Sequence, residues 1–573
     1  MERQRPDTTS NELDLYIRTY YSLLRSSGEI RVRAFEEAHT YSQSSLHAGA
    51  RDVTPDISAF GYSAARLPEC MDEVRRVVLG QAADQFEPVV GAVKTWQRVS
   101  ARGRRRPMRY DGNGTLAVII ASYSDIDDLV PMVTAYQLEW NKMHSLLANS
   151  TLADELKQGT TSIDDPHFDA RLAETLTLDL AGAQRLRAAF GARMQQALQA
   201  MVSTRLDLRM QLVAGSLSHY QRAANRWWTG IEPIYLSSGN ELRRRPVYFV
   251  SSNTHSLANL LGGHALAHKD AILETARRED PDHVLPELER ALAEGAPDAA
   301  NLLYFCLREH LHRVPGALDE VQKWDAASGI VTVPNPGHIE VSAQVVEMRS
   351  LLPERFDPRV TMPGLERLWA SDAVIVNIDY PLGMAAYQLL ARVGQGVGSL
   401  RGVYVMGKAA TLNGRVGDVM VSKVVQDEHS HNTYIFQNAF QASDLAPYLR
   451  YGTVLDNQKA LTVRSAFLQN ADYMSTFYRE GYTVLEMEAG PYLSAVFELV
   501  DPRRHPTDEL VYLGERPPFE LGLLHYASDT PYSRRQSLVS KSLSFFGMDS
   551  TYACAIAIVR RILKQELTRL AQV

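Results

Sequence analysis

The stretch TVLEMEAGPYLSAVFELV, residues 483–500, places Glu486 and Glu488 in an otherwise apolar segment. A carboxylate in such surroundings needs hydrogen-bond donors, a cation, a shifted pKa or a ligand, unless it is simply exposed. The β-prone start of the stretch and its later small residues predict a strand, then a helix from about Pro491. Glu488 would then lie at the carboxyl edge of a sheet, where open α/β folds bind ligands. Glu486 would point to the same side of the strand.

Similar short apolar runs recur through the second half of the chain, and they alternate with helical stretches such as 381–392 and 552–570. Because βα alternation is typical of a parallel sheet covered by helices, residues 236–573 are predicted to form an α/β domain with a largely parallel sheet. Residues 264–325 have a helical pattern and could form an insertion in it. The predicted strand runs are 247–250, 329–333, 372–378, 402–406, 417–425, 482–487 and 521–527.

The first 235 residues have a different pattern and are predicted to form a mostly α-helical domain of unknown role. Thr9 and Glu12 have the spacing of a capping box, and apolar residues then follow the helical period. Apolar residues recur every three or four positions from Leu186 onward and predict one long amphipathic helix that runs toward Trp227 and Trp228.

Composition excludes several classes of protein. The 573 residues carry 60 basic and 67 acidic side chains, a formal charge of -7, so no global attraction to nucleic acid or anionic lipid is expected. The three cysteines lie far apart without a CxxC pair, which favours neither a disulfide framework nor a thiolate zinc site. The N-terminus lacks a signal-peptide core, and no apolar run is long enough to span a bilayer. We expect a cytoplasmic protein.

Two further segments carry candidate chemistry. In MGKAATLNGRVGDVMV, residues 406–421, a strand is predicted to end at Gly407 and Lys408, where small residues admit a substrate and the lysine could meet phosphate. In LGLLHYASDTPYSRRQS, residues 521–537, a strand runs into Ser528 and Asp529. A partly desolvated Asp529 could stay protonated and act as a general acid. Each segment, taken alone, also fits an ordinary turn.

Together these segments resemble the nucleoside phosphorylase and nucleosidase superfamily, over residues 245–570 and best over 372–535. The glycine-rich strand end with Gly417–Asp418, the Met487–Glu488 pair before a small-residue helix, and Ser528–Asp529 after a late strand occur in the superfamily's order and spacing. The resemblance implies a phosphorylase-type mixed sheet. It also implies cleavage of the N-glycosidic bond of a purine nucleoside or nucleotide, by phosphorolysis or hydrolysis.

The resemblance also assigns roles to residues. Asp529 would protonate the purine N7, and Glu488 would hold the ribose hydroxyls. Substrate contacts would come from Met487 beneath the sugar, from Lys408 and Arg534 at a free phosphate or a 5′-phosphate, and from Gly407, Ser528 and His429. No cofactor is implied, and self-association into a homo-oligomer is expected.

Departures from the superfamily leave alternatives open. Phosphorylases commonly carry Ser, Thr or Cys where this chain has Val405, so the sequence does not choose between phosphate and water as nucleophile. The competing hypothesis is a sensor that binds a nucleoside or nucleotide without turnover and signals through its helical half. A metal site is not expected, because His264 and His268 have metal-ligand spacing but lack the glutamate of HExxH.

Overall fold

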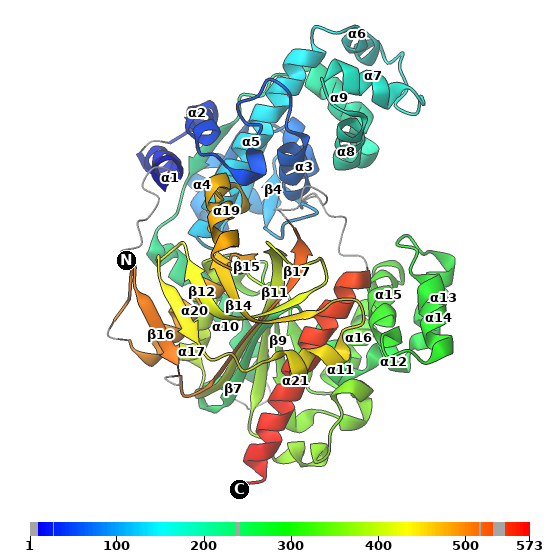
Figure 1. The fold of residues 1–573 in the computed structure, drawn as a ribbon, viewed down its shortest axis with the longest axis vertical. Coiled ribbons are helices and arrows are strands. Elements are labelled where there is room, and N and C mark those ends of the chain that lie inside the picture. Colours follow the sequence, from blue (N-terminus) through cyan, green and yellow to red (C-terminus); the bar gives the residue numbers. More distant parts are fainter. Residues whose placement is uncertain are drawn as a thin grey trace. The chain divides into compact units, whose positions relative to one another are not determined.

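The computed structural model describes residues 10–26, 28–236, 241–502, 504–514, 517–530 and 545–572 (Figure 1). The chain forms two compact units. The first comprises residues 1–223, 338–340 and 463–480, and the second comprises 224–337, 341–462 and 481–573. Residues 463–480 therefore fold with the first unit, although they lie within the α/β half of the sequence.

The first unit combines helices with a six-stranded sheet that the helical patterning did not predict. The strand order is β1 (Ile30–Arg31), β6 (Arg209–Leu212), β2 (Arg76–Gly80), β5 (Thr115–Ile119), β4 (Met108–Tyr110) and β3 (Gln97–Val99). The helices are α1 (Ser10–Ser26), α2 (Arg33–Tyr41), α3 (Ile57–Arg66), α4 (Ala83–Val90), α5 (Tyr123–Leu147), α6 (Thr151–Gln158), α7 (Phe168–Thr175), α8 (Leu180–Phe190), α9 (Met194–Ser203) and α19 (Ala471–Arg479).

The single long helix predicted from Leu186 to Trp228 is wrong. Helix α8 ends at Phe190, because the next residue, Gly191, has a φ of +56° that suits glycine and breaks the helix, and α9 begins at Met194. The chain then forms β6 before α10 (Leu217–Leu236) begins. The helical spacing on either side of these breaks is real, but spacing alone does not show where a helix stops.

The second unit has an 11-stranded mixed sheet covered by helices, which confirms the predicted α/β class. Its strand order is β16 (Leu510–Gly514), β13 (Thr433–Phe436), β12 (Val419–Asp427), β14 (Val454–Thr462), β15 (Tyr482–Glu486), β11 (Ser399–Thr411), β7 (Pro246–Ser252), β10 (Val374–Asp379), β9 (Ala343–Glu347) and β8 (Ile330–Val333), with β17 (Glu520–Asp529) paired to β11 and β12. Every predicted strand run overlaps one of these strands, and four of the seven runs extend one or two residues beyond it. Patterning missed β9, β13, β14 and β16.

The helices of this unit follow the predicted alternation, and the helical pattern of residues 264–325 corresponds to five consecutive helices. These are α12 (His264–Ala267), α13 (Lys269–Arg278), α14 (Leu285–Glu294), α15 (Ala299–Arg313) and α16 (Ala317–Ala326). The others are α11 (Ser256–Gly262), α17 (Ala385–Gly396), α18 (Ala442–Leu445), α20 (Ala489–Val500) and α21 (Phe545–Leu570). None of the helices in the described ranges has the length and apolar character needed to cross a lipid bilayer.

Strand β17 closes part of the sheet into a ring. It runs parallel to β11 and antiparallel to β12, so the strands β12, β14, β15, β11 and β17 return to their starting point. Strands β12, β14 and β15 run parallel to one another, and β15 is antiparallel to β11. Because β11 and β15 pair only near their last residues, the ends of both strands meet at one place.

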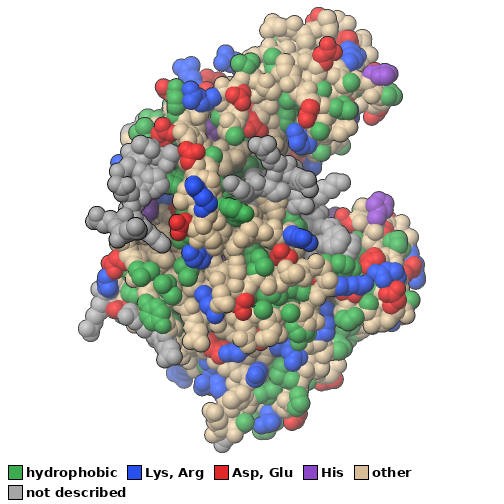
Figure 2. Space-filling view, in the orientation of Figure 1, with side chains coloured by type: hydrophobic (Ala, Val, Ile, Leu, Met, Phe, Trp, Pro, Cys, Tyr) green, Lys and Arg blue, Asp and Glu red, His purple; other side chains and the backbone are tan. Residues whose placement is uncertain are grey.

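Helix α21 packs on β11 and β17 (Figure 1) and is anchored by one buried carboxylate. Glu566 accepts hydrogen bonds from the hydroxyls of Tyr248, at 2.9 Å, and Ser371, at 2.7 Å. It also accepts two hydrogen bonds from the guanidinium of Arg401. On the face drawn in Figure 2, basic and acidic side chains are interspersed, consistent with the modest net charge.

Strand β11 runs to Thr411, past the strand end that was predicted at Gly407 and Lys408. A Cβ added to Gly407 would lie 2.3 Å from the ring of Tyr380. Gly407 therefore makes room for the protein's own tyrosine, and Lys408 is an exposed residue within the strand.

Replacing Gly407 by alanine should destabilise the fold, because the new methyl group would overlap the buried Tyr380 ring. We expect Gly407→Ala to lower the free energy of unfolding by about 1–3 kcal/mol in urea titrations. The control is Ser399→Ala, at the exposed start of the same strand, which should change stability by no more than about 0.5 kcal/mol. Equal stability of Gly407→Ala and the wild type would contradict the packing role.

Candidate functional site at the strand ends

The strand ends of the second unit bring the candidate acids close together. Ala410 of β11 pairs with Leu485 of β15 on one side and with Asp529 of β17 on the other. Two interstrand spacings of about 4.8 Å place the Cα atoms of Leu485 and Asp529 roughly 10 Å apart. Across the ring, Asp427 pairs with Thr462, and Thr462 pairs with Glu486. Residues far apart in sequence therefore border one region.

Glu486 is a buried carboxyl that the protein itself binds. Its Oε2 accepts hydrogen bonds from the backbone N–H groups of Glu488 and Ala489, both at 2.6 Å, at the start of α20. Its Oε1 accepts a short hydrogen bond from the Thr462 hydroxyl. The partial positive charge of a helix N-terminus favours such a carboxylate. Burial, together with the charge of Glu488, nevertheless raises the pKa of Glu486 to about 8.

The ring of His525 lies near this carboxyl. Its Nε2 is 3.9 Å from Oε2 of Glu486, and both side chains are fully buried. Burial lowers the pKa of His525 to about 4, so the imidazole is neutral near pH 7. This histidine therefore places no full positive charge beside Glu486.

Asp427, at the end of β12, organises a second polar group beside α20. Its carboxylate accepts hydrogen bonds from Nδ1 of His429, at 2.9 Å, and from the hydroxyl of Ser430, at 2.6 Å. Burial opposes ionisation, but the hydrogen bonds and charge of these partners outweigh it and hold the pKa of Asp427 below its ordinary value. A Cβ on Gly490 would lie 2.5 Å from Cγ of Asp427, so only glycine lets the carboxyl approach the helix this closely.

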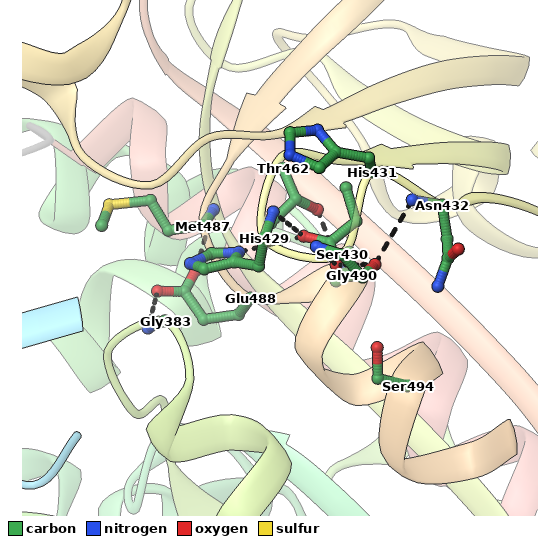
Figure 3. Close-up of polar contacts among 12 residues, drawn as sticks. Gly383, His429, Ser430, His431, Asn432, Thr462, Met487, Glu488, Gly490 and Ser494 are labelled. Atoms are coloured by element: carbon green, nitrogen blue, oxygen red, sulfur yellow. Dashed lines mark hydrogen bonds and ion pairs between the residues drawn. The ribbon is translucent and has the colours of Figure 1, made fainter. Parts of the chain in front are cut away.

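Glu488 is 5% exposed and also has protein donors. Its Oε1 accepts a hydrogen bond from the Gly383 N–H, at 2.9 Å, in the loop between β10 and α17, and its Oε2 lies 3.3 Å from the Met487 N–H. Burial, followed by the charges of Glu488 and Glu486, raises the pKa of nearby Tyr380. Figure 3 shows Glu488, Gly383 and Met487. It also shows His429 and Ser430, which follow β12, and Gly490 in the first turn of α20.

The remaining predicted residues occupy different positions. Met487 is partly exposed, and the His429 side chain is 2% exposed. The Ser528 hydroxyl is 2.9 Å from Oδ2 of Asp529 and 3.3 Å from the Ala409 carbonyl oxygen. A bulge at Ser528 leaves Asp529 paired with Ala410, on the face of β11 that carries Lys408. Arg534 lies outside the described residues.

The contributors that were not predicted include Thr462, Gly383 and Gly490. Thr462 ends β14, whose polar residues interrupt the alternation of apolar and polar residues that marks a strand. Gly383 acts through its backbone N–H, which has no sequence signature. Gly490 could have been found, since a glycine in the first turn of a helix costs stability and usually has a packing reason. The Asp427–His429 spacing was visible in the sequence, but its contact with α20 was not.

The chain belongs to a family of unknown function, DUF6909. The family model matches residues 32–564. No curated protein matches the sequence.

Solved structures of two enzyme classes are distantly similar. The 5′-methylthioadenosine/S-adenosylhomocysteine nucleosidase of Campylobacter jejuni is 9% identical, over 42% of this chain and 92% of that chain, with a TM-score of 0.28. The corresponding enzyme of Neisseria meningitidis is 12% identical, over 39% and 86%, with a TM-score of 0.26. Uridine phosphorylase of Vibrio fischeri is 9% identical, over 43% and 88%, with a TM-score of 0.28.

The raised pKa of Glu486 predicts a pH-dependent stability. A folded-state pKa near 8, above the ordinary value of 4.5, means that the folded protein binds this proton more tightly than the unfolded chain. The stabilisation that this proton gives to the folded state is complete below the pKa of the unfolded chain. It is lost as pH rises through about 8. The Glu486→Gln variant should therefore lose less stability than the wild type between pH 6 and pH 9 in urea unfolding.

An exposed carboxyl provides the matched comparison for this experiment. Glu354→Gln, on an exposed side chain, should keep the pH dependence of the wild type. Identical pH profiles of Glu486→Gln and the wild type would show that Glu486 does not titrate in this range.

Proposed function

We propose that this chain cleaves the N-glycosidic bond of a purine nucleoside or nucleotide. The observation that carries the proposal is the pairing of Ala410 with both Leu485 and Asp529. Through this pairing, β15, which leads to Glu488, and β17, which ends at Asp529, lie on either side of the end of β11. Cleavage of this bond needs stabilisation at two points, the sugar and the departing base, and two separated carboxyl groups suit that requirement.

Glu488 is proposed to hold the sugar. An ionised carboxylate offers about four acceptor positions, so it can keep its hydrogen bond from Gly383 and accept others from the 2′- and 3′-hydroxyls. Its negative charge also favours the positive charge that develops on the ribose. Because the Gly383 N–H fixes one oxygen, Glu488 meets the sugar with little loss of side-chain freedom. Met487, next to it and partly exposed, packs under the ribose.

Asp529 is proposed to be the general acid. Protonated, it donates its proton to N7 of the purine, so the base departs neutral instead of as an anion. Proton donation of this kind typically contributes about 10²- to 10⁴-fold in rate. Ser528, whose hydroxyl is 2.9 Å from the Asp529 carboxyl, orients it.

The other assignments follow from charge and position. Asp427 fixes the ring of His429, which we assign to the wall of the site behind Glu488. Lys408, exposed on the face of β11 shared by Asp529, is assigned to a free phosphate or a 5′-phosphate as a compact positive charge. Arg534 is assigned to the same phosphate from the sequence resemblance alone. The attacking group is water or inorganic phosphate.

The test is release of free base from purine nucleosides and nucleotides, with and without inorganic phosphate. We expect Asp529→Asn to lower kcat by about 10²-fold or more while ligand binding persists, because it removes a proton donor. Glu488→Gln should weaken binding of ribosides far more than binding of the free base. Dependence on phosphate separates phosphorolysis from hydrolysis.

The matched control is Glu366→Gln, which alters an exposed carboxyl and should leave turnover unchanged. Unchanged turnover in Asp529→Asn would remove Asp529 from the role of acid. Saturable nucleotide binding by the wild type without release of base from any substrate would contradict the proposed enzyme and support the alternative, a nucleotide sensor.

A further inference from the structure

Three metal-ligating side chains meet in the helical segment of the second unit, outside the site at the strand ends. His264 begins α12, His268 directly follows that helix, and Glu320 lies in α16. Each offers one ligand atom, and the three atoms lie within 4.8 Å of one another. The two imidazole rings are stacked, with centroids 4.2 Å apart and planes inclined by 20°. The third potential ligand, Glu320, thus comes from another helix than the two histidines.

The backbone orients His268 for metal binding. Its Nδ1 is 3.0 Å from the His264 carbonyl oxygen, which assigns the ring proton to Nδ1 and leaves a lone pair on Nε2. That Nε2 is 3.9 Å from Oε1 of Glu320. Metal-binding histidines commonly donate the other ring N–H to a carbonyl or carboxylate in this way, because it fixes the tautomer and the ring orientation.

His264 supplies an independent observation. The residue is 5% exposed, and neither ring nitrogen has a hydrogen-bond partner among the described residues. Buried polar atoms are nearly always hydrogen-bonded, and an exception calls for an explanation such as an ion.

We propose that His264, His268 and Glu320 bind a Zn²⁺ ion, with water as the fourth ligand. Two imidazoles and one carboxylate form a ligand set that suits zinc and leaves an open position. The side chains of His268 and Glu320 are 32% and 64% exposed, so the ion can reach the site from solvent.

Binding requires the ligand atoms to move closer together and the two nearly parallel rings to turn toward the ion. Zinc bonds of about 2.0–2.1 Å in a tetrahedron hold ligand atoms roughly 3.4 Å apart, so the ion would draw atoms that lie within 4.8 Å of one another together by at most about 1.4 Å. The exposed Glu320 has the freedom to move. Trp324, which packs edge-on against both imidazoles and donates a hydrogen bond to the Gly262 carbonyl at 2.7 Å, supports the rings from one side. The ion would join α12 to α16.

The experiment uses Co²⁺ as a spectroscopic probe for Zn²⁺ in the whole 573-residue chain after chelator treatment. The wild type should bind one Co²⁺ per chain, with visible absorption from a coordinated ion that Zn²⁺ then abolishes. His264→Ala, His268→Ala and Glu320→Gln should each weaken binding by at least the ten- to hundredfold typical of supporting residues. Circular dichroism and thermal melting without metal show whether each variant is folded.

Two surface variants test for adventitious binding. His312→Ala and Asp319→Asn alter exposed residues of α15 and α16 and should keep the wild-type signal. Absence of saturable binding by the wild type, or a full signal from folded His264→Ala, would overturn the zinc site. The readout does not involve nucleosides, so the result is independent of the proposed activity.

Discussion

The buried Glu486 carboxyl and the first turn of α20 together form the contact on which the strand-end region depends. Two backbone N–H groups of that turn and the Thr462 hydroxyl donate to the carboxyl, and the Gly490 N–H donates to Thr462 at 2.8 Å. A carboxyl removed from water is tolerable only with such donors. The contact joins the ends of β14 and β15 to α20 and fixes the position of the next acid, Glu488.

Asp427 extends this contact to the neighbouring strand. Its carboxylate lies against Gly490 and also holds His429 and Ser430. Asp427, Thr462 and Glu486 are paired residues on three adjacent strands, and all three side chains have partners within the protein. The same region contains an acid with a raised pKa and an acid with a lowered pKa. Carboxyl groups whose surroundings separate their pKa values in this way are typical of sites that bind or transfer protons.

Several site residues could be predicted because their positions follow from strand periodicity. Glu488 and Asp529 were placed at strand ends, and the structure has them next to β15 and at the end of β17. The strand end at Gly407 and Lys408 was misplaced, because the glycine reflects packing of Tyr380, which comes from a distant segment. Thr462 and Gly383 could not be found, since one donates through a common hydroxyl and the other through the backbone.

The sequence by itself determined the α/β class of the second unit, the position of its principal strands and the strand–turn–helix around Glu488. Those features depend on hydrophobic periodicity, which is a local property of the chain. Tertiary structure alone decided the ring closed by β17, the sheet of the first unit, and the meeting of His264 and His268 with Glu320. It also decided which donors hold the two glutamates. Hydrogen bonds and ligand sets of this kind join segments up to hundreds of residues apart, and local patterning contains no information about such distances.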